Sequence, residues 1–281
     1  MTTPLATRFT VGRLVCWTLD AGLQRLDGGA MFGVVPRALW ERRLQPDDQH
    51  RVTLALRCLL VEHPGGLVLV DTGVGNKGSP KFREIYGIEN AGETGPTRLE
   101  DALAASGYRP EDVRWVVNTH LHFDHCGGNT VRRPGGAVEL AFPGATHVLQ
   151  RRELEFASHP NERTRASYLA PNFAPVAAAA RTRLIDGETE LLPGVHCLPT
   201  PGHVPFHQSV VVRDGGETLC FLGDLIPTAA HLQPAWIMAY DLEPLVTLAT
   251  KQALLARAAR EDWTVVFPHD TSVASTRVAG A

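Results

Sequence analysis

Hydrophobic and polar residues alternate along the first seventy positions in the manner of a β-sheet. Arg13 to Leu19 and Val52 to Val61 are rich in Val, Leu and Cys, and the apolar run Leu67 to Val70 follows the turn sequence Pro64-Gly65-Gly66. These runs predict three strands, of which the last two form a hairpin.

The segment Asp20 to His50, between the first two predicted strands, has no regular pattern and contains Gly28-Gly29 and Pro36. A connection of this length in a compact domain usually has a function or forms a small excursion of its own. We expect such an excursion here, with one helix at Arg37 to Arg43.

Helix and strand patterns alternate in the rest of the chain. A helix at Arg98 to Ser106 precedes the apolar strand Val113 to Val117, and a long helical period covers Pro244 to Arg260. The order of sheet, helix, sheet and helix predicts an α/β fold with two mixed sheets and helices outside, which is a four-layer αββα sandwich. No linker or repeat divides residues 1–281, which we expect to form a single domain. The other predicted elements are strands at Thr146 to Leu149, Val195 to Leu198, Gln208 to Val212, Leu219 to Leu222 and Thr264 to Phe267, and a helical region from Arg151 to Ala180.

Composition excludes several classes of function. The net charge of −3 gives no basic surface for nucleic acid. No apolar run approaches the ~18 residues of a membrane helix, and Met1 to Thr10 has no secretory signal pattern, so we expect a cytoplasmic protein. The five cysteines form no C-x-x-C pair, which favours buried thiols over disulfides or a cysteine zinc site.

Four metal-ligating side chains fall within six residues just after the strand Val113 to Val117. They are His120, His122, Asp124 and His125. Alternate residues of a strand share a face, so His120 and His122 can point at one metal while the other two turn toward a second. Burying this cluster without a metal would leave several polar groups unsatisfied. Imidazole and carboxylate ligands suit zinc, iron or manganese.

Three more candidate ligands follow later predicted strands. His203 lies in Thr200-Pro201-Gly202-His203, Asp224 follows a strand directly after Gly223, and His269 lies after the last strand. Because a carboxylate can bridge two metals, Asp224 is the candidate bridge.

The pattern H-x-H-x-D-H, followed by a histidine, an aspartate and a final histidine, resembles the metallo-β-lactamase fold superfamily over nearly the whole chain. The resemblance implies two divalent metal ions per chain, zinc or alternatively iron, cobalt or manganese. Asp71, in Val70-Asp71-Thr72-Gly73, matches the superfamily's early aspartate and is expected to orient a ligand. The implied ligands are His120, His122 and His203 for the first metal, Asp124, His125 and His269 for the second, and Asp224 for both.

Longer segments are similar to the quorum-quenching N-acyl homoserine lactonases: Leu26 to Pro36, Asp224 to His231 and Pro234 to Asp241. This similarity implies that a metal-bridging hydroxide opens the lactone and that Asp124 carries a proton to the leaving alkoxide. The chain departs from those lactonases at Pro227, where they have a tyrosine that contacts the substrate carbonyl. Tyr240 or His231 would have to supply that donor. The expected pocket residues, whose apolar surface suits an acyl chain, are Met31, Phe32, Phe123, His231, Trp236 and Tyr240.

The expected partner is therefore a small ester or lactone, without nucleic acid or membrane, and related lactonases suggest a homodimer. Three alternatives stay open at this point. The same site could hydrolyse phosphotriesters or aryl esters, or a thioester as glyoxalase II does. A third hypothesis is a metal-binding scaffold without activity. A β-lactamase is disfavoured because a bridging Asp224 is not the metal pattern of those enzymes.

Overall fold

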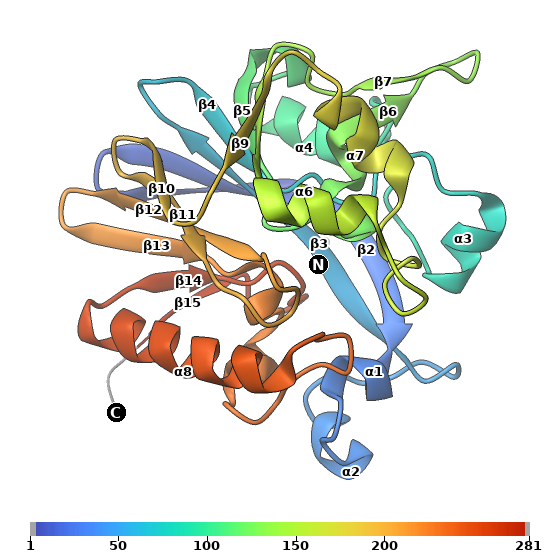
Figure 1. Cartoon of the computed structure of the whole chain (residues 1–281), viewed down its shortest axis with the longest axis vertical. Helices are drawn as coiled ribbons and strands as arrows, with labels where there is room; N and C mark the ends of the chain where they lie inside the picture. The colour runs from blue at the N-terminus through green and yellow to red at the C-terminus, as the bar shows by residue number, and fades with distance from the viewer. Residues whose placement is uncertain (1–3, 279–281) are drawn as a thin grey trace.

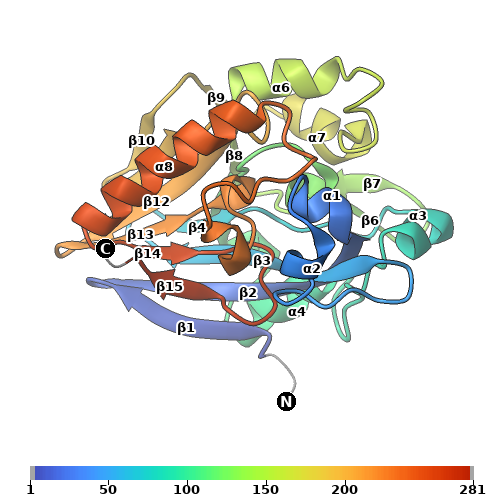
Figure 2. The same cartoon turned by 90° about the horizontal axis from the view of Figure 1, so that it is seen from below.

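A computed structural model describes residues 4–278 of the chain. Two β-sheets lie face to face with helices on their outer sides (Figures 1 and 2). The first sheet has the strand order β1-β2-β3-β4-β5-β8-β9, antiparallel as far as β4 and parallel beyond it. Its strands are β1 Ala6–Val11, β2 Leu14–Asp27, β3 Arg51–Glu62, β4 Leu67–Val70, β5 Val113–Val117, β8 Thr146–Gln150 and β9 Thr182–Ile185.

The second sheet runs in sequence order from β10 to β15 and is antiparallel except between β13 and β14. A separate two-stranded sheet pairs β6 with β7. These strands are β6 Thr130–Arg132, β7 Val138–Leu140, β10 Thr189–Leu192, β11 Val195–Pro199, β12 Gln208–Asp214, β13 Glu217–Phe221, β14 Thr264–Val266 and β15 Ser275–Arg277.

Three buried clusters hold the layers together. Between the sheets, Cys16 and Val61 of the first sheet pack with Val210 of the second. On the outer faces, Leu103 of helix α4 (Arg98–Ala105) packs against the first sheet, and Leu254 of helix α8 (Pro244–Arg260) packs against the second. Figure 2 shows α8 lying over the second sheet. The predicted four-layer αββα arrangement is confirmed.

Two predicted boundaries are wrong. Strand β2 continues to Asp27, so the excursion begins at Gly28 rather than Asp20. A register shift between Asp20 and Leu23 hides the strand, because the extra residue of a bulge breaks the alternation of inward and outward side chains. The excursion holds two short helices, α1 (Gly28–Phe32) and α2 (Arg37–Trp40), and the second ends three residues earlier than Arg43.

The predicted helical region Arg151 to Ala180 is also interrupted. It forms α6 (Arg151–Ser158) and α7 (Ala170–Ala177), joined by turns. Pro160 explains the break, since a proline disfavours helical backbone at the residue before it. The remaining α-helices among the described residues are α3 (Pro80–Ile85) and α5 (Phe123–Cys126).

All five cysteines are buried free thiols. Across residues 4–278, no helix combines the length and the apolar character needed to cross a membrane.

Candidate metal centre

The histidine-rich run lies in the turn that follows β5. His120 and His122 belong to the loop after Val117 rather than to the strand itself, and Asp124 and His125 lie on α5. The strand-face argument for His120 and His122 is therefore wrong, although the two side chains do converge. The loop is tight because Gly127 packs on the backbone of Val74, where a Cβ atom would collide with the carbonyl group.

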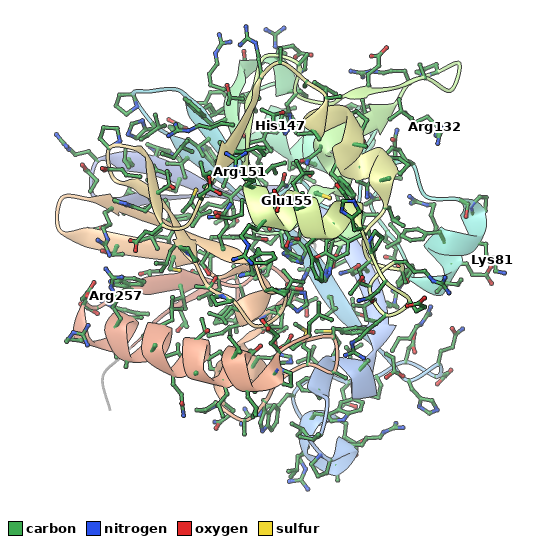
Figure 3. All side chains as sticks on the ribbon, in the orientation of Figure 1. Lys81, Arg132, His147, Arg151, Glu155 and Arg257 are labelled. Carbon is green, nitrogen blue, oxygen red and sulfur yellow. The ribbon has the colours of Figure 1, made fainter. Side chains whose placement is uncertain are left out.

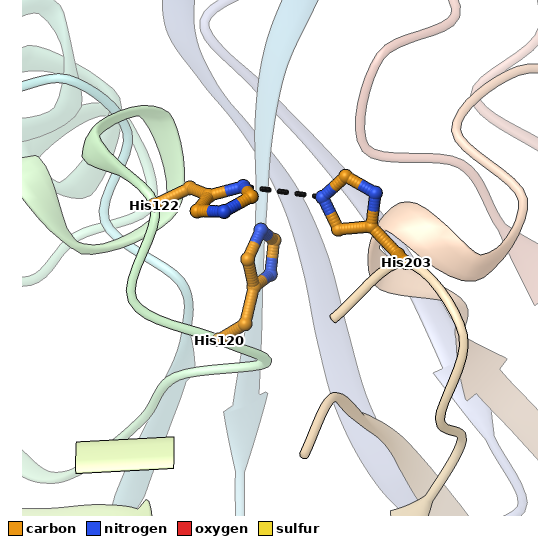
Figure 4. Close-up of side chains that lie close together, drawn as sticks. All are labelled: His120, His122 and His203. Atoms are coloured by element: carbon orange, nitrogen blue, oxygen red, sulfur yellow. Dashed lines mark hydrogen bonds between the residues drawn. The ribbon is translucent and has the colours of Figure 1, made fainter. Parts of the chain in front are cut away.

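Three histidines form the first ligand group. Nitrogen atoms of His120, His122 and His203 all lie within 4.8 Å of one another. Figure 4 shows the three rings converging, with His122 Nδ1 and His203 Nε2 separated by 3.1 Å. The Nε2 atom of His120 is buried and has no hydrogen-bond partner among the residues described.

Asp124, His125 and His269 form the second group, and their ligand atoms meet the same 4.8 Å limit. The Nε2 atoms of His125 and His269 are 3.1 Å apart. Asp124 Oδ2 lies 3.8 Å from the first of these nitrogens and 3.6 Å from the second. The chain thus brings together residues separated by more than 140 positions.

Asp224 lies between the two groups. Its Oδ1 atom is 3.2 Å from Nε2 of His125 and 3.0 Å from Nε2 of His269, whereas its Oδ2 atom is 3.3 Å from Nε2 of His203. One carboxylate therefore presents a different oxygen to each group.

The turn after β13 fixes the backbone of Asp224. Gly223 has a φ of 54°, and the next amide, of Asp224, donates a hydrogen bond to Nε2 of His207 at 3.0 Å. Burial and the neighbouring His203 lower the pKa of His207 to about 3, so its ring is neutral and can accept this bond. His207 therefore supports the site without belonging to either ligand group.

Each ligand histidine of the second group has a partner on its other ring nitrogen. Asp71 Oδ2 lies 2.8 Å from Nδ1 of His125, and the carbonyl oxygen of Ala55 lies 2.7 Å from Nδ1 of His269. Asp71 also accepts hydrogen bonds from the amide and hydroxyl of Thr119 and has a φ of 57°, a strained value for a residue other than glycine. Such partners fix the tautomer and the direction of a ligand ring.

In the first group, Asp241 Oδ1 lies 2.9 Å from Nδ1 of His203. Asp241 was not predicted as a site residue, although it ends one of the lactonase-like segments. An aspartate in a loop carries no signal of its own, and only the fold brings it to His203.

Electrostatics at the site suit metal ligands. Burial, followed by the neighbouring histidines, lowers the pKa values of His120 and His122 well below their usual range, so both rings are neutral. Burial alone would raise the pKa of Asp224, but the surrounding histidines outweigh it and hold that pKa well below its usual range. The neutral rings of His120 and His122, the ionised carboxylate of Asp224 and the unpartnered Nε2 of His120 together fit divalent cations.

A cavity of about 360 Å³ opens onto the two ligand groups. Met31, Phe123 and Tyr240, three of the predicted pocket residues, line it. The prediction missed Tyr86 and Arg163, which also line it, because they come from a short helix end and from the loop between α6 and α7.

The prediction is wrong for the other three pocket residues, which do not line this cavity: Phe32, His231 and Trp236. The Phe32 ring stacks on the His231 ring with their centroids 4.8 Å apart. It meets the Trp236 ring edge-on at a centroid distance of 5.6 Å. Both ring nitrogens of His231 are engaged, with the Met31 carbonyl at 2.8 Å and the Thr228 hydroxyl at 2.7 Å. These aromatic residues therefore pack behind the residues that line the cavity. His231 is not free to donate a hydrogen bond to a substrate.

Comparison with known proteins identifies the family to which the chain belongs. The family model of the metallo-β-lactamase superfamily matches residues 55–269. The chain belongs to this superfamily. That membership agrees with the fold and with the ligand pattern expected from the sequence.

Two curated relatives are named as lactonases. The N-acyl homoserine lactonase AiiA of Bacillus thuringiensis subsp. kurstaki is 30% identical over 226 residues, which cover 78% of this chain and 82% of the relative. An N-acyl homoserine lactonase of a Bacillus species is 35% identical over 165 residues, 57% of this chain. That match spans only 59% of the relative's length. Both relatives are hydrolases of the class expected from the sequence.

Solved structures share the fold. A probable metal-dependent hydrolase from Staphylococcus aureus has a TM-score of 0.89 at 27% identity, over 96% of this chain and 94% of that one. AidC, a dizinc quorum-quenching lactonase in complex with a product, has a TM-score of 0.80 at 20% identity, over 98% and 94%. The likeness to AidC concerns the fold alone.

Proposed function

We propose that this protein is a dinuclear metal-dependent lactonase that opens N-acyl homoserine lactones. The observation that carries the proposal is the position of Asp224, whose two oxygens face two different ligand groups at 3.0–3.3 Å. A superfamily member with that arrangement, and with lactonases among its relatives, is best explained as an enzyme with two metals.

The residues that would hold the first ion are His120, His122 and His203, and those for the second are Asp124, His125 and His269, with Asp224 shared. Zinc is the proposed ion because the donor set is nitrogen and carboxylate oxygen and because the fold is that of a dizinc lactonase. Divalent ions bound there would polarise an ester carbonyl and make a water molecule nucleophilic at neutral pH.

The chain's own residues supply the remaining chemistry. Asp124 lines the cavity as well as belonging to the second ligand group, so its carboxylate can take the proton that the attacking water loses and deliver it to the leaving oxygen of the opened ring. Asp71 and Asp241 hold His125 and His203 in place while this happens, because each accepts a hydrogen bond from the ring nitrogen that faces away from the site.

The cavity provides both an apolar wall and a hydrogen-bond donor. Leu26, Met31 and Met238 offer apolar surface that suits an acyl chain. Pro227 has no side-chain donor for the substrate carbonyl, and His231 lies behind the cavity wall. Tyr240, which lines the cavity, is therefore the proposed donor. Partial desolvation of the phenol and the nearby Asp27 carboxylate raise the pKa of Tyr240, so the phenol keeps its proton and can donate to a substrate oxygen.

Parallel steady-state kinetics test the proposal. The zinc-loaded protein would be assayed with N-hexanoyl homoserine lactone, with paraoxon and with a glutathione thioester. We expect the largest kcat/KM for the lactone. If kcat/KM were largest for paraoxon, the protein would be a phosphotriesterase. If it were largest for the glutathione thioester, the protein would be a thioesterase. Hydrolysis of none of the three would favour a metal-binding scaffold.

A further inference from the structure

Gln24 is a fully buried amide in contact with the second ligand group. The residue lies on β2 with an exposed fraction of 0%, and its Nε2 donates a hydrogen bond to Oδ2 of Asp124. Its Oε1 atom is buried without a hydrogen-bond partner in the part of the chain that the structure describes. A buried glutamine with half its amide unsatisfied is costly, so the contact to Asp124 calls for an explanation.

The β-bulge of β2 puts Gln24 in this place. The register with β3 shifts between Asp20 and Leu23. Gly22 has a φ of 114°, a backbone conformation that residues with a side chain rarely adopt. Beyond the shift, Gln24 pairs with Leu54 and Leu23 pairs with Ala55. Bulges commonly re-aim a side chain next to a functional site.

The same stretch of the β2–β3 pair contacts two ligands of the second group. The Ala55 carbonyl oxygen lies 2.7 Å from Nδ1 of His269, and the Gln24 amide reaches Asp124. With Asp71 on His125, each of the three residues then has a hydrogen-bond partner besides Asp224 and the group itself. None of these partners is itself a candidate ligand.

The chemistry of an amide suits this position. Oδ2 of Asp124 is the oxygen that faces the Nε2 atoms of His125 and His269. An N–H donor on that oxygen fixes the carboxylate in one rotamer through a charge-assisted hydrogen bond. Because the amide is neutral, it adds no further charge to a site that already contains Asp71, Asp124 and Asp224.

We propose that Gln24 is a positioning residue for the second metal ion and that its N–H holds Asp124 in the orientation that binds this ion. The inference rests on the metal centre of the proposed function and is independent of the substrate. Loss of an orienting partner typically lowers metal affinity 10–100-fold. The loss should be confined to the second site, because Gln24 makes no hydrogen bond to His120, His122 or His203.

Metal competition tests the proposal without any substrate. Zinc-loaded parent and Gln24→Leu proteins would be titrated with a chromophoric chelator to obtain a dissociation constant for each of the two ions. We expect one of the two dissociation constants to rise at least about tenfold in the variant, with the other unchanged. With cobalt in place of zinc, the absorption bands of one site should change while those of the other persist.

Gln150→Leu is the matched control. Gln150 is also a buried glutamine, and its Nε2 donates to the Gly187 carbonyl and to Gln208 Oε1, both at 2.9 Å, rather than to a ligand. This variant should lose thermal stability and keep both zinc constants. If Gln24→Leu fails to fold, Gln24→Met preserves the length of the side chain without the donor.

Two results would overturn the proposal: unchanged zinc constants in a folded Gln24 variant, or an equal loss at both sites. A parent protein that binds no zinc would instead overturn the metal centre of the proposed function.

Discussion

Asp241 and Asp224 contact opposite sides of the His203 ring. Asp241 Oδ1 lies 2.9 Å from Nδ1, and Asp224 Oδ2 lies 3.3 Å from Nε2. Burial acts against a charge on this ring, yet the two carboxylates raise the pKa of His203 above its usual value. Asp241 therefore determines which nitrogen of His203 is available to the site.

Removing the Asp241 carboxylate should weaken the first metal site. In Asp241→Ala, the His203 ring loses the acceptor that fixes it, and we expect 10–100-fold weaker binding of one zinc ion, measured by chelator competition. Asp241→Asn keeps a neutral acceptor and should show an intermediate loss. Unchanged zinc binding in Asp241→Ala would show that packing alone orients His203.

Gly223→Ala should misplace Asp224. A Cβ atom there would lie 2.5 Å from Nε2 of His207, on a backbone with a φ of 54°. We expect loss of both metal binding and hydrolysis, measured by metal analysis of the purified protein and by lactone turnover. Gly216→Ala is the matched control, because its φ is 85° and a Cβ atom meets nothing within 4 Å. The control should cost only about 1 kcal/mol of stability and keep its metal. Equal metal loss in both variants would trace the effect to backbone strain.

Tyr240→Phe should reduce turnover without changing metal content. If the phenol donates to the oxygen that becomes negative during ring opening, its loss should lower kcat by about a hundredfold, as for other such donors. Steady-state kinetics on N-hexanoyl homoserine lactone would measure kcat and KM separately. A kcat equal to that of the parent would remove Tyr240 from the mechanism. A change in KM alone would assign it to binding.

The acid sensitivity of the fold should depend on His147, on β8 (Figure 3). Burial lowers the pKa of His147 from 6.5 to about 4, and neither ring nitrogen has a hydrogen-bond partner within residues 4–278. Between these pH values the unfolded chain binds a proton at this ring and the folded chain does not. Stability is therefore full above about pH 7 and falls as the pH drops toward 4, by about 3 kcal/mol in total.

His147→Leu should remove this dependence. At pH 5 the contribution of His147 is about 2 kcal/mol, so the melting temperature of the parent should fall by roughly 4–8 °C more than that of the variant between pH 8 and pH 5. Measuring both proteins with excess chelator keeps metal release out of the comparison. His159→Gln, at an exposed histidine, should follow the parent. Parallel melting curves for His147→Leu and the parent would contradict the assignment.

The parts of the fold that the sequence predicted best have one dominant local signal. Strand β5 is a short apolar run and α8 is a long helical period, and both are found at the predicted bounds. Strand β2 was cut short because its bulge breaks the period of two on which the prediction depends. The β6–β7 pair was missed because strands of three residues are too short to show a period.

The candidate site divides in the same way. Its seven candidate ligands could be named from the sequence because clustered histidines and aspartates at the ends of strands are rare without chemistry. Gln24 and Asp241 were missed because single amides and acids are common, and only the tertiary fold brings them to Asp124 and His203. Phe32 and Trp236 were misplaced because composition cannot distinguish the surface of a pocket wall from the layer behind it.

A zinc titration of the metal-free protein with N-hexanoyl homoserine lactone as substrate tests the central claim most directly. The rate of ring opening would be followed as zinc is added in steps. We predict that the rate rises from the background of the buffer and reaches its plateau at two zinc ions per chain. A lactone opened no faster than in buffer at every zinc concentration, by protein that is shown to be folded, would contradict the assignment.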